Sequence, residues 1–173
     1  MLWNQRRKDR SFWAELQISS PQERAGPLER RVQTSHSIHY LKAKGTLTLD
    51  DIRHLVTTDP DNIMYFDTDK LVSRNQVEIA LQRSLFFHDS GSRVKSLSSI
   101  VAMMLSGNWQ IDRALSIVGL SAHTKRVMCI TIGDHNLPYM HMFEPDNEGL
   151  PENVPEMDRK VFRYITEIEY HLS

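Results

Sequence analysis

Cysteine is nearly absent from this sequence, since Cys129 is the only one among 173 residues. One cysteine cannot form a disulfide within the chain, which fits a reducing compartment. No apolar run approaches the about 18 residues that a membrane-spanning helix needs. The first residues are charged and lack the apolar core of a secretory signal. We therefore expect a protein of the cytoplasm and nucleus.

Glycine is also scarce, and the seven glycines are scattered. Neither G-x-x-x-x-G-K-[ST] nor G-x-G-x-x-G occurs, so no glycine-rich loop can surround the phosphates of ATP or NAD. The G-x-S-x-G motif of serine hydrolases is missing as well. A formal net charge of -1 gives no overall field that attracts nucleic acid or a membrane. These absences predict no enzymatic activity and no cofactor.

The composition is that of a globular protein, with 40% hydrophobic and 25% charged residues. Residues 1–35 differ, because they are rich in Arg, Gln and Glu. We expect them to form a solvated, flexible N-terminal extension, with a docking segment led by Trp3 and Trp13 as the alternative. Residues 36–173 are expected to form a single domain with its own core.

The first half of this domain predicts a strand, a helix and a second strand. Residues 37–43 and 62–66 are rich in β-branched and aromatic side chains, which favour strands. Between them, Thr48 stands three residues before Asp51, which is an acidic variant of the capping box that begins a helix.

Three helices are predicted in the middle of the chain. Ser73 and Gln76 match the capping box S-x-x-Q, and apolar residues follow at helical spacing. A second helix is expected from Ser96 to a stop signal at Gly107. A short third helix covers residues 111–118.

The last third of the chain is less regular. Residues 126–132 form an almost continuous apolar run, typical of a strand covered on both faces. Residues 139–143 could form a short edge strand within a loop. Val161, Ile165, Ile168 and Leu172 fit a helix, although a strand also fits. The predicted fold is α/β (α+β), with a small mixed or antiparallel sheet, helices packed on it and a central three-helix segment.

Few residues suggest chemistry. His135 and His141 flank a loop with Cys129 nearby in sequence, so a small metal-dependent hydrolase with His and Cys ligands is one alternative. Surface histidines and a buried thiol account for the same residues. We favour the second interpretation and predict no metal site.

Basic residues in the middle of the chain form a candidate RNA-binding surface. If they converge on one side, they could contact phosphates; the alternative is ordinary solvated charge. The candidates are Lys70, Arg74, Arg83, Arg93, Lys95 and Arg113.

Residues 37–132 contain three helix motifs followed by the apolar strand 126–132. The positions that define the motifs are Gln76, Val77, Ala80, Gln82, Arg83 and Ser84; Lys95, Ser96, Leu97 and Ser98; and Leu105, Ser106, Gly107, Asn108, Ile111, Ala114, Leu115, Gly119, Leu120 and Ser121. In these positions the stretch resembles a known family, the TPRKB-like small non-catalytic subunit of the EKC/KEOPS complex. The sequence departs from the family at Ile100, where an acidic residue is usual, and in its N-terminal extension.

The resemblance implies a specific function. Such subunits bind a small kinase-like ATPase, which in turn binds the enzyme that makes threonylcarbamoyladenosine in tRNAs reading ANN codons. The subunit supports the ATPase and helps to bind tRNA, without catalysing a reaction. An interaction domain of the same fold that works outside this complex is the alternative.

The resemblance also implies where the kinase-like partner binds, because the family's kinase-facing surface is apolar and helical. On the helices that begin at Ser73 and Ser96, the candidate contacts are Leu85, Phe86, Phe87, Met103 and Met104. Core packing is the alternative role for each of them.

Overall fold

The computed structural model of the protein describes residues 35–172, apart from the side chains of residues 157–162 and 169. The predicted extension, residues 1–35, therefore lies almost entirely outside the described residues. Within them the order of elements is β1 (His36–Ala43), α1 (Leu49–Thr57), β2 (Ile63–Asp67), the 3-10 turn η2 (Thr68–Lys70), α2 (Arg74–Asp89), α3 (Leu97–Ser106), α4 (Ile111–Val118), β3 (Arg126–Ile132), η3 (Met140–Met142), β4 (Phe143–Pro145) and α5 (Pro155–Leu172).

The four strands form an antiparallel sheet in the order β2-β3-β1-β4. Strand β3 lies between β1 and β2, so the β1-α1-β2 unit is a split strand–helix–strand motif. The sequence prediction of a small sheet with helices packed on it is confirmed, and the sheet is antiparallel rather than mixed.

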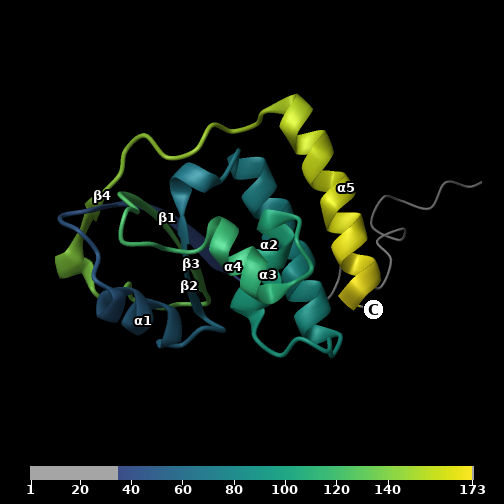
Figure 1. Ribbon diagram of the computed structural model, residues 1–173, viewed down its shortest axis with the longest axis horizontal. Coiled ribbons are helices and arrows are strands. Elements are labelled where there is room, and N and C mark those ends of the chain that lie inside the picture. The colour runs from purple at the N-terminus through teal and green to yellow at the C-terminus, as the bar shows by residue number, and fades with distance from the viewer. Residues whose placement is uncertain (1–34, 173) are drawn as a thin grey trace, which may run out of the picture. The chain divides into compact units, whose positions relative to one another are not determined.

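Side chains that alternate along β3 separate the interior into two clusters. Met128 and Ile130 join a cluster with α2, α3, α4 and α5, while Val127 and Cys129 join another with Leu55 of α1. Figure 1 shows α1 on one side of the sheet and the other helices on the opposite side. The expectation that this strand is covered on both faces is confirmed.

The N-terminus of α2 is fixed by polar groups from three parts of the chain. The Ser73 hydroxyl accepts from the Gln76 amide, as the capping box predicts. The Gln76 side chain does not return to Ser73, however; it accepts from the Val72 amide and donates to the Leu105 carbonyl at the end of α3. The first amides of α2, those of Arg74 and Asn75, donate to carbonyls of residues 151 and 152. Gln76 therefore joins two helices, which a local motif cannot show.

Helix α3 is the centre of the larger cluster. Seven of its ten residues are buried, so it has no free face. It ends at Gly107, which takes a left-handed conformation with φ of 66° as expected for a helix C-cap. A Cβ at this glycine would lie 2.7 Å from a ring carbon of Tyr164 on α5, so the residue also allows close packing of α5.

Helix α1 is attached more lightly. Its predicted capping box is present, with the Thr48 hydroxyl accepting from the Asp51 amide and the Asp51 carboxylate accepting from the Thr48 amide. Leu55 is its only buried residue, whereas Leu49 is 76% exposed and Val56 44% exposed.

The C-terminal segment resolves two open predictions. Residues 155–172 form helix α5, with Ile165, Ile168 and Leu172 buried against the larger cluster. The edge strand expected over 139–143 is displaced to β4, because Tyr139 adopts a left-handed conformation and a 3-10 turn follows it. None of the described helices is long and apolar enough to cross a membrane.

Candidate partner-binding surfaces

Three of the five residues predicted to contact a partner lie in the core instead. Leu85, Met103 and Met104 are at most 4% exposed, and all three pack in the cluster between the sheet and its four helices. Their helical spacing arises from this packing, which was the alternative role considered for them. In this arrangement they cannot touch a partner directly.

Phe86 and Phe87 lie nearer the surface, at the C-terminal end of α2. Both are half-buried, and their rings meet edge to face with centroids 5.5 Å apart. Phe87 packs against the large cluster. A partner-binding role for this pair stays a prediction.

The six predicted RNA-binding residues do not share one helix face. Arg74 and Arg83 are nine residues apart on α2, about two and a half helical turns, so they point to opposite sides. Arg93 and Lys95 follow the far end of the same helix. An RNA that contacted Arg74, Arg83, Arg93 and Lys95 together would have to follow the whole length of α2 and reach both of its sides.

Lys70 and Arg113 lie at or near α4. The Lys70 ammonium donates to the Gly119 carbonyl at 3.0 Å and pairs with Asp67 at 3.5 Å. Lys70 is thus partly committed to holding the end of α4, whereas Arg113 is exposed on that helix. A role in RNA binding stays a prediction for all six residues.

Large apolar side chains are exposed on and beside α4. Ala114 and Val118 are buried and face the core, while Leu115 and Ile117 are 41% and 42% exposed. Trp109, two residues before the helix begins, is 54% exposed. Trp109, Arg113 and Ile117 follow one another at a spacing of four residues and are called the α4 surface below, whereas Leu115 points about 160° away from Ile117 around the helix.

Trp109 is held in place by the C-terminal helix. Its ring stacks on the ring of His171 with centroids 5.1 Å apart and planes inclined by 24°. Tyr170, which is 82% exposed, meets His171 edge to face. The stacking fixes the orientation of Trp109 while leaving about half of it open to solvent.

A second exposed apolar face lies on α1. Leu49, Ile52 and Val56 recur at spacings of three and four residues, so they lie on one side of the helix; Leu49 and Val56 are exposed, and Ile52 is half-buried against the smaller cluster. They are called the α1 stripe below. Asp50 is exposed at the start of this helix and pairs with Arg53 at 3.5 Å.

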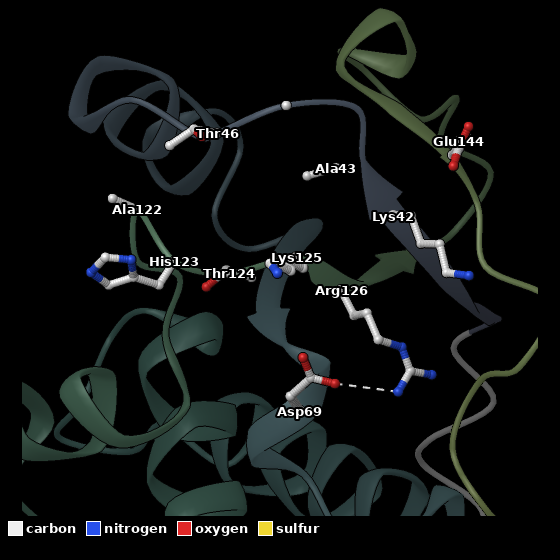
Figure 2. A pocket seen from close by; sticks show the side chains of 11 residues that line it. Lys42, Ala43, Thr46, Asp69, Ala122, His123, Thr124, Lys125, Arg126 and Glu144 are labelled. Atoms are coloured by element: carbon white, nitrogen blue, oxygen red, sulfur yellow. Dashed lines mark hydrogen bonds and ion pairs between the residues drawn. The ribbon is translucent and has the colours of Figure 1, made fainter.

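An open pocket of about 700 Å³ lies where β1 ends and β3 begins. Figure 2 shows Lys42, Lys125 and Arg126 around it, with His123 on the opposite side and Asp69 beneath Arg126. Within the described part of the chain, neither the Lys125 ammonium nor the His123 ring has a hydrogen-bond or ion-pair partner. These two groups could bind an anion.

Arg126, by contrast, is engaged in a network of bonds. It donates to the Asp146 carboxylate at 2.7 Å, to Asp69 at 3.2 Å and to the Gly149 carbonyl at 2.8 Å. Lys42 also lies 3.7 Å from Asp146. The side chain of Asp146 is fully buried. Burial acts to raise its pKa, but the hydrogen bonds from Arg126 and the Glu148 amide outweigh this and lower the pKa below its usual value.

The residues of the alternative metal site are not assembled. The described residues contain no group of three or more His, Cys, Asp or Glu side chains that could hold a metal ion. Cys129 is fully buried, and burial raises the pKa of its thiol to about 12. Such a thiol is protonated at neutral pH and is a poor nucleophile or ligand.

The sequence alone did not identify the exposed apolar residues on and beside α4 or the Arg126–Asp146 pair. Trp109 had no periodic pattern around it, and Leu115 and Ile117 belong to a helix whose buried side could not be identified without α3. The Arg126–Asp146 pair joins residues 20 apart in the sequence, with no local signal. The position of Trp109 directly after the Gly107-Asn108 helix stop was the one available hint.

Exposed apolar residues on a helix are one kind of surface through which proteins bind one another. The chain belongs to the family described as kinase binding protein CGI-121, whose profile matches residues 43–163. The match runs from the end of β1 into α5, so it covers both the α1 stripe and the α4 surface. A comparison with curated proteins gave no match.

Proposed function

We propose that the protein is a non-catalytic subunit of an EKC/KEOPS-type assembly that modifies tRNAs reading ANN codons with threonylcarbamoyladenosine. In this role it binds the kinase-like ATPase subunit, supports its activity and, through it, joins the threonylcarbamoyl-transferring enzyme. The observation that carries the proposal is the match to a kinase-binding family over residues 43–163. The exposed apolar helix faces support it, because a partner would remove them from water.

Affinity purification of the tagged full chain from its native cell, at moderate salt and with mass spectrometry, tests the assembly. We expect a small kinase-like ATPase and the threonylcarbamoyl-transferring enzyme to co-purify. If a folded, abundant protein recovers neither, the second candidate holds: an interaction domain of the same family that works outside this complex.

Contact with tRNA is the second part of the proposal. The unpartnered Lys125 and His123 in the pocket support it, since a lysine ammonium and a histidine ring both donate to phosphate oxygens. Lys125→Ala is expected to weaken tRNA binding by the full assembly and to reduce the slope of log affinity against log salt by about 1. The same assay on Arg93→Ala tests the prediction from the sequence that Arg93 contacts RNA. Unchanged affinity and slope for Lys125→Ala would remove the pocket from the RNA contact.

A further inference from the structure

We propose that the kinase partner docks on the α4 surface, with Trp109, Arg113 and Ile117 at the centre of the contact, and that the α1 stripe stays outside it. This assignment rests on the proposed function, because it names the surface through which the same partner is bound. It replaces the predicted contacts on α3, which has no free face.

The side chains of the α4 surface are of the kinds that dominate protein interfaces. Trp and Arg are enriched among the residues whose truncation costs the most binding energy. Trp109 and Arg113 are both exposed, and Ile117 lies one helical turn beyond Arg113. The α1 stripe offers only aliphatic side chains, of which Leu and Val are under-represented at such positions.

The residues of the α4 surface are also held in place by contacts within the unbound protein. Ala114 and Val118 anchor the inner side of α4 in the core. The Lys70 ammonium holds the carbonyl at its end, and the His171 ring holds Trp109. A surface that is already ordered loses little conformational entropy on binding.

Helix α1 lacks this support. Leu55 is its one fully buried residue, with Ile52 half-buried beside it, and Leu49 is the first residue of the helix. Binding through the α1 stripe would have to order a lightly attached element, which costs free energy.

The side chains of the α4 surface indicate which chemical groups the partner must present. The contact must offer an apolar groove for Trp109 and Ile117, with a carboxylate placed to meet the exposed guanidinium of Arg113. An acidic side chain on the rim of an apolar patch of the kinase fits this description.

Binding of the purified kinase to the full chain tests the assignment, with three variants compared by isothermal titration calorimetry. Trp109→Ser/Ile117→Ser removes apolar contact from the α4 surface, and Arg113→Glu reverses an exposed charge with no cost to the core. The matched control is Leu49→Ser/Val56→Ser on α1. Both α4 variants are expected to weaken binding by about 30-fold or more, and the control by less than about 3-fold.

Circular dichroism and thermal melting confirm that each variant is folded, and Arg113→Glu keeps the test valid if the double variant is not. If the α1 control loses binding while Arg113→Glu retains it, the docking assignment is wrong and kinase binding stands. If the wild-type chain does not bind the kinase at all, the proposed function itself fails.

Discussion

One face of the sheet packs against four helices, and the other against α1 and the irregular segment before β4. The first face contains 22 buried residues of the described chain in one cluster, and the second contains eight. Because stabilisation grows with the apolar area removed from water, most of the folding free energy comes from the four-helix face. We therefore expect α1 to open locally while the four-helix face stays folded.

The comparison also separates two kinds of helix. Helix α3 is buried on every side, whereas α4 buries Ala114 and Val118, packs Ile111 beside them and exposes Leu115 and Ile117. Both carry apolar residues at helical spacing, so periodicity alone does not distinguish a buried central helix from a partly exposed one. The elements that pack around each helix determine which of its apolar residues are buried.

The largest expected effect comes from a charge placed in the four-helix face. Ile100 is fully buried, although it stands where the resemblance leads one to expect an acidic residue. Ile100→Glu would bury a carboxylate at a cost of several kcal/mol, against a total stability of about 5–15 kcal/mol. We expect an unfolded or partly folded protein by circular dichroism. Ser99→Glu, in the first turn of the same helix, is the control and should stay folded.

The same apolar truncation should have different consequences on the two faces. Leu81 on α2 and Leu55 on α1 are both fully buried. Leu81→Ala is expected to lower the global free energy of unfolding by about 2–5 kcal/mol. Leu55→Ala should instead release α1 locally, so that amides of residues 49–57 exchange hydrogen rapidly while those of α3 stay protected. Equal loss of protection in α1 and α3 would show that the two faces unfold as one unit.

A smaller effect is expected where Arg126 and Asp146 join the sheet to the segment before α5. Asp146→Asn removes the charged hydrogen bond, which is worth about 1–3 kcal/mol. The pKa of Asp146 is lowered in the folded protein, so its contribution is present above the unfolded pKa of about 3.9 and is lost as the pH falls through the folded pKa. Denaturant titrations between pH 3 and 7 should therefore show a shallower pH dependence for the variant.

The control for this pair is Glu144→Gln, an exposed residue of β4 beside the same network. Its stability should match that of the wild type within about 0.5 kcal/mol. Identical pH dependence of Asp146→Asn and the wild type would show that the buried carboxylate does not contribute as its geometry indicates.

The smallest effect concerns Cys129, which lies beneath α1. A buried thiol with a pKa of about 12 is almost fully protonated at pH 8. A thiol reagent should therefore label the native protein very slowly and the urea-unfolded protein at once. Since α1 covers this face, Leu55→Ala should speed labelling more than Leu81→Ala does. Fast labelling of the wild type would mean that the α1 face opens readily.

Local signals in the sequence predicted much of the fold. Thr48 and Ser73 were identified as helix starts from their own neighbours, and the apolar run 126–132 was identified as a strand covered on both faces. These features depend on residues a few positions apart. The second half of the Ser73 motif was different, because Gln76 bonds to Leu105 in another helix, and no local rule contains that contact.

The exposed surface was harder to predict for the same reason. Met103 and Met104 have the composition of a contact site, yet they are buried because α2, α4 and α5 surround α3. Trp109 is exposed because the chain turns there between two helices. Exposure is a property of the assembled fold, so the family could be recognised from the sequence while the exposed surface of the helices could not.

The most direct test of this account is hydrogen exchange of the full chain, measured by mass spectrometry with and without the purified kinase partner. The account predicts slower exchange in residues 107–119 on binding and no change in residues 49–57. Slower exchange in 49–57 with 107–119 unchanged would contradict it, because the kinase would then be bound through the lightly attached face of the molecule.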